Sequence, residues 1–134
     1  MLTTTTVRAE TRSISIAAPP AVVLGYVGDP RCLPEWAPAF ARGVRPDGEH
    51  WLVDTGEGEL RIAVRVSPGH GTVDLLSADD PTRGAFTRVV ANHGGSEYLF
   101  TLCFPEGTPE EAIEQQMTTV EAELETVRAH CEAS

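Results

Sequence analysis

The chain has 134 residues, of which 41% are hydrophobic and 22% are charged, as is ordinary for one globular domain with one core. Its formal net charge is −10, which disfavours nucleic acids and anionic membranes as partners, because both attract clustered cations. All 10 basic residues are arginines, so catalysis through a lysine imine is excluded.

The N-terminal region bears on where the protein resides. Residues 1–10 are polar and rich in threonine, and they lack the basic and apolar segments of a secretory signal peptide. No apolar run approaches the ~20 residues that a membrane-spanning helix needs. We therefore expect a cytoplasmic protein without membrane insertion, with a single domain over 1–134 that begins with a flexible segment at 1–9.

Three elements are predicted near the start of the chain. Alternating polar and apolar residues give a strand at 10–17. Pro20 stands in the first turn of a short helix that closes at Gly28. Asp29 is suited to cap a second short helix that has Pro30 at its first position. We therefore expect one strand followed by two short helices.

A meander of six strands is predicted next, because alternating runs are separated by turn signals that are rich in glycine, proline and aspartate. The expected strands lie at 40–45, 50–55, 59–66, 72–77, 84–92 and 97–104. Connections this short form hairpins, so the sheet is expected to be antiparallel. The fold class that follows is α+β.

The last element is a long helix with a single apolar stripe. A capping box of Thr108 and Glu111, with Pro109 at the first helical position, predicts its start. Acidic side chains such as Glu121 and Glu123 are expected on its solvent side. The stripe must be buried against the sheet, leaving a cavity between the two, and it consists of Ile113, Met117, Val120, Leu124, Val127 and Cys131.

The N-terminal half also carries a family resemblance. The segments at 13–23 (SISIAAPPAVV), 28–30 (GDP) and 33–38 (LPEWAP) resemble the opening of the START-like or SRPBCC superfamily, above all its polyketide cyclase/dehydrase group. The resemblance implies a helix-grip (Bet v1-like) fold, in which a seven-stranded curved antiparallel sheet grips the C-terminal helix around a hydrophobic cavity. Members of the superfamily bind lipids, sterols or polyketides, and some catalyse cyclisation or dehydration.

Strand alternation predicts which side chains face this cavity, since successive residues of a strand point to opposite faces. The aromatic side chains at 97–104 form one such face, and the apolar side chains at 59–66 form another. With mid-helix and rim positions added, the expected ligand-binding residues are Trp36, Trp51, Val53, Ile62, Val64, Phe86, Arg88, Tyr98, Phe100, Met117 and Val120.

Two of these residues are candidates for catalysis. The facing of the strand at 84–92 stays open, because a slip of one residue brings either Phe86 and Arg88 or their neighbours inward. An inward Arg88 would be a buried cation that needs an anionic partner, such as a ligand carboxylate or an enolate. Tyr98 can donate a hydrogen bond to a ligand carbonyl. Arg88 and Tyr98 are therefore the candidate catalytic residues.

Metal and cofactor sites are not predicted. The 3 cysteines are far apart and form no Cys-x-x-Cys pair. His50, His70 and His93 fall on one predicted rim of the meander, but their spacing matches no metal motif, so separate surface histidines are favoured. No glycine loop suited to a phosphate or dinucleotide occurs, and no cofactor is expected.

Three functions fit these features. The first is a polyketide cyclase or aromatase that binds a hydrophobic, aromatic or polyketide-like molecule. The second is a non-catalytic carrier or sensor of a lipid-like ligand, and the third is a protein-interaction module with a filled core. A monomer or weak homodimer is expected. A cavity of about 300 Å³ or more would argue against a filled core, and the cyclase hypothesis needs a titratable side chain inside that cavity.

Overall fold

The structure is a computed structural model that describes residues 4–133. The predicted order of elements is confirmed, although the second short helix begins with a 3-10 turn, η1. The helical segments are α1 (Pro20–Val27), η1 (Pro30–Cys32), α2 (Leu33–Trp36) and α3 (Glu110–Glu132). The strands are β1 (Arg8–Ile16), β2 (Gly43–Asp47), β3 (His50–Asp54), β4 (Glu59–Ser67), β5 (Thr72–Ser77), β6 (Gly84–Asn92) and β7 (Gly95–Phe104).

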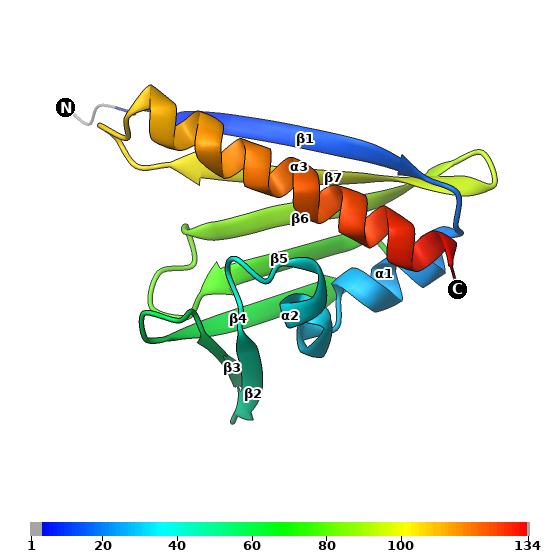
Figure 1. Cartoon of the computed structure of the whole chain (residues 1–134), viewed down its shortest axis with the longest axis horizontal. Coiled ribbons are helices and arrows are strands. Elements are labelled where there is room, and N and C mark those ends of the chain that lie inside the picture. Colours follow the sequence, from blue (N-terminus) through cyan, green and yellow to red (C-terminus); the bar gives the residue numbers. More distant parts are fainter. Residues whose placement is uncertain (1–3, 134) are drawn as a thin grey trace.

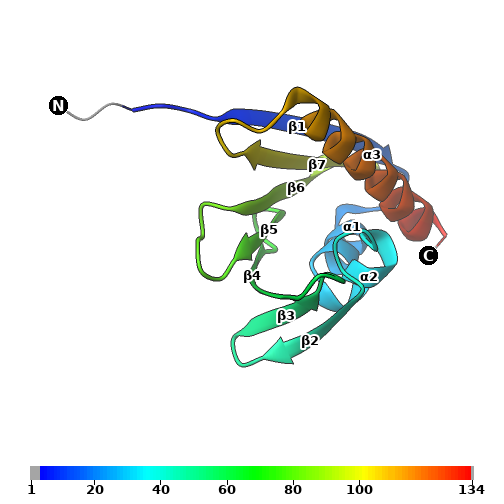
Figure 2. The same ribbon diagram turned by 60° about the vertical axis from the view of Figure 1, so that its left-hand side comes forward.

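The strands form one antiparallel sheet of seven strands in the order β1-β7-β6-β5-β4-β3-β2. Consecutive strands from β2 to β7 are neighbours, and β1 pairs with β7 at the far edge (Figure 1). The sheet is strongly curved, and α1, α2 and α3 all lie on its concave side (Figure 2). This arrangement confirms the α+β fold with a long C-terminal helix across a curved sheet.

The apolar stripe of α3 is the centre of the core. All six of its residues are buried, and none is more than 4% exposed. The helix runs alongside β1 in both ribbon views (Figure 1, Figure 2). Although α3 has 23 residues, no helix among the described residues is long and apolar enough to cross a membrane.

The predicted capping box at the start of α3 is wrong. The helix begins at Glu110, and the residue that precedes it, Pro109, has extended backbone angles and no side chain that can cap. Thr108 therefore lies one position too early to cap the helix, and its hydroxyl donates to the carbonyl oxygen of Pro105 at 2.6 Å instead. Glu111 is consequently left without its reciprocal partner.

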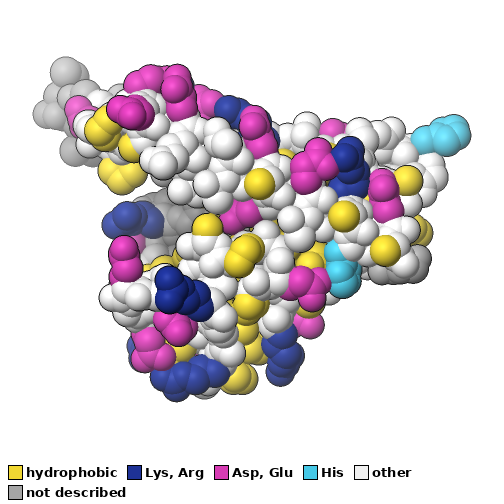
Figure 3. All heavy atoms as spheres, viewed as in Figure 1, with side chains coloured by type: hydrophobic (Ala, Val, Ile, Leu, Met, Phe, Trp, Pro, Cys, Tyr) yellow, Lys and Arg dark blue, Asp and Glu magenta, His cyan; other side chains and the backbone are white. Residues whose placement is uncertain are grey.

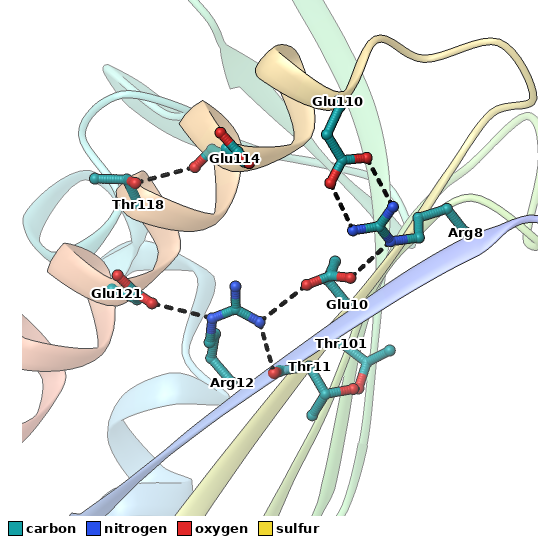
Figure 4. A network of polar contacts seen from close by, with 9 residues as sticks. All are labelled: Arg8, Glu10, Thr11, Arg12, Thr101, Glu110, Glu114, Thr118 and Glu121. Carbon is teal, nitrogen blue, oxygen red and sulfur yellow. Dashed lines mark hydrogen bonds and ion pairs between the residues drawn. The ribbon is translucent and has the colours of Figure 1, made fainter.

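A row of ion pairs ties α3 to β1 (Figure 4). The Arg8 guanidinium donates to both carboxylate oxygens of Glu110 at 2.8 and 3.0 Å, and Arg12 Nε donates to Glu121 at 3.0 Å. Glu10 lies between the two arginines and accepts from each, at 2.7 and 3.2 Å. Exposed pairs add little stability individually, but this row fixes the β1 side of α3 at two points along the helix.

These contacts correct one prediction about the N-terminus. Arg8 and Ala9 do not belong to a flexible segment, because they pair with Phe104 and Cys103 in the sheet. Residues 4–7 carry no regular secondary structure and are exposed, and residues 1–3 lie outside the described residues.

The C-terminal end of α3 is joined to the short helices. The hydroxyl of Tyr26 donates to Glu35 Oε1 at 2.7 Å, and His130 Nδ1 lies 2.7 Å from the same oxygen. The rings of Tyr26 and His130 are stacked, with their centroids 4.0 Å apart. The helix is therefore fixed along β1 and at its C-terminal end.

We predict that Met117→Ala lowers the free energy of unfolding by about 2–5 kcal/mol, because the side chain is 1% exposed and its removal leaves a cavity in the core. Urea unfolding followed by circular dichroism measures the change. The matched control is Gln115→Ala, which alters an exposed side chain of the same helix and is expected to change stability by less than about 0.5 kcal/mol. Equal effects of the two substitutions would contradict the packing described above.

Candidate functional site

A cavity of about 450 Å³ lies between α3, α2 and the concave face of the sheet. Its wall is mainly apolar and is formed by Trp36 and Leu33 of α2, Ile62 of β4, Leu75 of β5 and Phe100 of β7. The space-filling view shows the molecule hollowed beside α3, with an acidic side chain near the hollow (Figure 3). A volume of this size argues against the filled core of a protein-interaction module.

The register of the sheet decides which face of β6 is inward. Thr87 is opposite Phe100 and Val89 is opposite Tyr98, and both β6 residues are buried. Arg88 is exposed on the other face, together with the partly buried Phe86. Of the two facings that the sequence left open, the structure has the one with Thr87 and Val89 inward, so Phe86 and Arg88 do not line the cavity as expected of ligand-binding residues. This register avoids burying an unpaired guanidinium, which would be costly.

The remaining predicted ligand-binding residues divide into three groups. Trp36, Ile62 and Phe100 line the cavity, and their contact with a ligand stays a prediction. Trp51 lies outside the lining, where the Arg31 guanidinium stands 5.0 Å from the centre of its ring. The others pack in the core or against it without lining the cavity, namely Val53, Val64, Tyr98, Met117 and Val120.

The acidic side chain of the cavity is Glu123, which sequence reasoning placed on the solvent side of α3. It is 7% exposed and lines the cavity. Within residues 4–133, no hydrogen bond or ion pair engages its carboxyl group. Burial alone raises the pKa of this group from 4.5 to about 7. Glu123 can therefore hold or release a proton near neutral pH.

The helix pattern contained a signal for this position. Gln116 and Glu123 are seven residues apart, so they lie on the same side of the apolar stripe, two turns from each other. Both line the cavity. Because the sheet is concave, it faces a wider arc of α3 than the six stripe residues cover. The positions that flank the stripe are therefore the signal in the sequence that points to Glu123.

Two further polar side-chain atoms are buried, and one of them belongs to a residue of the cavity wall. Among the described residues, Trp36 Nε1 and the Tyr98 hydroxyl are buried without a hydrogen-bond partner. The neighbouring Thr87 hydroxyl donates to the carbonyl oxygen of Val73 at 2.7 Å, and burial raises the pKa of Tyr98 above its ordinary range. Unpaired buried donors are rare and costly. Trp36, which lines the cavity, can only donate, so it suits a ligand oxygen.

The histidines of the predicted rim do not assemble a metal site. His70 Nδ1 shares a hydrogen bond with the Ser67 hydroxyl at 2.8 Å, and His93 is exposed in a turn with a φ of 55°. In the part of the chain that the structure describes, no group of three histidine, cysteine or acidic residues could hold a metal ion.

We predict that Glu123→Gln raises the free energy of unfolding most above pH 7. The folded-state pKa of about 7 lies above the ordinary 4.5, so the folded protein holds this proton more tightly than the unfolded chain does. That advantage is complete below pH 4.5 and is lost as the pH rises through 7. The variant should therefore match the wild type in acid and exceed it by on the order of 2 kcal/mol in alkali.

Urea unfolding at several pH values measures this difference. The control Glu114→Gln changes an exposed carboxyl of the same helix and should give a small difference that does not grow between pH 4.5 and 7. A constant gap between wild type and Glu123→Gln across this range would contradict a buried, unpaired carboxyl.

Comparison with known proteins places this geometry in a family. A family model described as polyketide cyclase/dehydrase and lipid transport matches residues 8–130. No curated protein matches the sequence.

Solved structures share the fold at low identity. A START superfamily protein from Mycobacterium smegmatis has 14% identity and a TM-score of 0.69, over 93% of this chain and 97% of that chain. The Zhui aromatase/cyclase from a Streptomyces species has 17% identity and a TM-score of 0.67, over 94% of each chain. The Aha1 dimer from Colwellia psychrerythraea has 15% identity and a TM-score of 0.73, over 93% and 96%. Since the family model matches nearly the whole sequence, the chain belongs to the polyketide cyclase/dehydrase and lipid transport family.

Proposed function

We propose that the protein binds an apolar, ring-containing molecule with a carbonyl group in the cavity beneath α3, and that Glu123 exchanges a proton with it. The observation that carries this proposal is a carboxyl group that faces an apolar cavity without a partner. A structural carboxyl would be paired or exposed, because burying it alone is costly. Its place at a cavity wall instead provides a proton acceptor for a ligand.

The cavity supports binding through its size and its composition. Its volume of about 450 Å³ lies within the range of about 300–1,000 Å³ that is common for sites that bind small molecules. The aromatic and aliphatic wall favours an apolar ligand, at roughly 25 cal/mol for each Å² of apolar surface removed from water. Family and fold also suggest hydrophobic ligand binding.

The polar groups support chemistry of the cyclase type. The Glu123 carboxylate takes a proton from the carbon next to a ligand carbonyl, so the C–H bond breaks and an O–H bond forms on Glu123. The electron pair moves to the carbonyl oxygen, which gives an enolate. A hydrogen bond from Trp36 Nε1 stabilises that oxygen. The enolate carbon then attacks a second carbonyl carbon of the same molecule, which closes a ring and restores the first carbonyl. The second carbonyl oxygen takes the proton back from Glu123 and becomes a hydroxyl, so the Glu123 carboxylate is regenerated.

The main rival is a carrier or sensor that uses the same cavity without turnover. Binding is common to both functions, whereas proton transfer from carbon belongs to the enzyme alone. Among the residues predicted for catalysis, Arg88 is on the outer face of the sheet, so it has no part in the proposal. The role of the Tyr98 hydroxyl stays a prediction.

We predict that Ala85→Phe weakens binding of the neutral fluorescent probe phenylnaphthylamine at least about tenfold, because the new ring occupies the cavity that Ala85 lines. Fluorescence titration measures the dissociation constant. Ala91→Phe is the matched control, since it adds the same ring at an exposed position of the same strand and should leave the affinity unchanged. Equal binding by both variants would place the probe elsewhere.

We predict that the wild type accelerates deuterium exchange at the α-carbon of the bicyclic ketone β-tetralone and that Glu123→Gln exchanges about 100-fold more slowly. The rate should rise with pH through about 7, as the carboxyl loses its proton. Proton NMR in deuterated buffer follows the reaction, with Glu114→Gln as the control. If Glu123→Gln exchanges as fast as the wild type while still binding phenylnaphthylamine, the protein is a carrier or sensor.

A further inference from the structure

The cavity has a second charged residue besides Glu123, and it is a cation. Arg83 lines the cavity from the loop between β5 and β6, and its side chain is exposed. The other lining side chains are apolar or neutral. Arg83 therefore stands where the cavity meets solvent, and Glu123, which is 7% exposed, lies further inside.

Arg83 differs from most arginines of this chain. Within residues 4–133, seven of the 10 arginines form ion pairs with a carboxylate, namely Arg8, Arg12, Arg31, Arg45, Arg61, Arg65 and Arg128. Arg42, Arg83 and Arg88 form none. Of these three, Arg83 alone lines the cavity. Because the protein has a net charge of −10, an arginine at the cavity that forms no ion pair is a local site where an anionic ligand can bind.

The loop holds Arg83 in a defined position. Its backbone N–H donates to the carbonyl oxygen of Asp80 at 3.0 Å, and its carbonyl oxygen accepts from the backbone N–H of Ser77 at 2.9 Å. The Asp80 carboxylate is engaged by the backbone N–H and the hydroxyl of Thr82, at 3.0 and 2.6 Å. The Asp80 carboxylate is therefore hydrogen-bonded within the turn. The Arg83 guanidinium contributes least to lowering the pKa of Asp80, after the bonds from Thr82, and the two side chains form no ion pair.

The next residue, Gly84, fixes where the loop joins the sheet. A Cβ atom at Gly84 would come within 2.1 Å of the carbonyl oxygen of Leu75, and its φ is +149°. Only glycine tolerates so close an approach of two strands at this backbone angle. The backbone of Arg83 is thus held in place by its hydrogen bond to Ser77 of β5 and by the close approach of Gly84 to Leu75.

The two charged residues serve separate parts of the cavity. Arg83 is exposed in the loop between β5 and β6, whereas Glu123 is buried on α3, and no ion pair joins the two side chains within residues 4–133. A ligand can therefore place an anionic group at Arg83 without bringing it against Glu123. Its apolar body then extends along the wall that includes Phe100 and Leu75.

We propose that the ligand is an amphiphilic acid whose carboxylate is bound by Arg83 at the mouth of the cavity while its apolar body lies inside, beneath α3. Arginine suits this role because its planar guanidinium can donate two parallel hydrogen bonds to a carboxylate. This inference rests on the proposed binding function and adds the class of ligand to it. It requires no covalent step.

A matched pair of probes tests the inference. Naphthylacetic acid and naphthylacetamide have nearly the same shape and differ in charge, and each is used to displace phenylnaphthylamine in a fluorescence titration. The wild type should bind the acid about three- to tenfold more tightly than the amide, as expected for a partly exposed charge pair. In Arg83→Gln this preference should vanish, with the affinity for the amide unchanged.

Arg88→Gln is the control, because it removes the same charge from an exposed arginine on the other face of the sheet. It should keep the preference for the acid, which separates a local contact from the overall charge of the protein. Equal displacement by acid and amide in the wild type, or an unchanged preference in Arg83→Gln, would overturn the inference while leaving ligand binding intact. Failure of phenylnaphthylamine itself to bind would instead overturn the proposed function.

Discussion

The burial of the apolar stripe of α3 against a concave sheet is the interaction on which the rest of the structure depends. An isolated helix with so many charged residues gains little from propensity alone, so packing must stabilise it. The stripe packs with the strands at the β1 edge and with α1, where the sheet and the helix are close. Because the sheet curves away toward β4 and β5, the same helix cannot fill the space above those strands. The cavity is a consequence of docking a straight helix on a curved surface.

This geometry explains how a carboxylate comes to be buried. A residue that flanks the stripe on the β1 side reaches solvent and the arginines of β1, as Glu121 does with Arg12. Glu123 lies two positions further along the chain on the opposite flank, where it meets the cavity wall and no cation. The identical side chain is therefore a surface ion-pair partner on one flank and a neutral-pH acid on the other. Burying a carboxyl group without a partner lowers the stability of the fold, and such destabilising residues are typical of functional sites.

Sequence patterns predicted the fold well because each element has its own strong period. Hairpin signals indicated which strands are neighbours from β2 to β7, and the six-residue stripe indicated α3. The place of β1 beside β7 does not follow from hairpin signals, and the helix-grip arrangement was implied by the family resemblance. The predictions that failed concern residues for which the local sequence pattern favours two orientations almost equally. Both faces of β6 carry apolar side chains, so only pairing with β7 decided that Thr87, and not Arg88, is inward. Glu123 was missed because residue type outweighed position, and its burial depends on the curvature of a distant sheet.

The tolerance of apolar packing for substitution accounts for the low sequence identity among proteins that share this fold. Core positions tolerate exchange of one apolar residue for another if volume is kept, so solved structures at about 15% identity can share the fold. The two charged residues that line the cavity of this chain lie outside that apolar core, on a flank of α3 and in the loop between β5 and β6. The shared fold therefore does not specify the ligand, and the functional proposals for this chain rest on its own residues Glu123 and Arg83, which line the cavity.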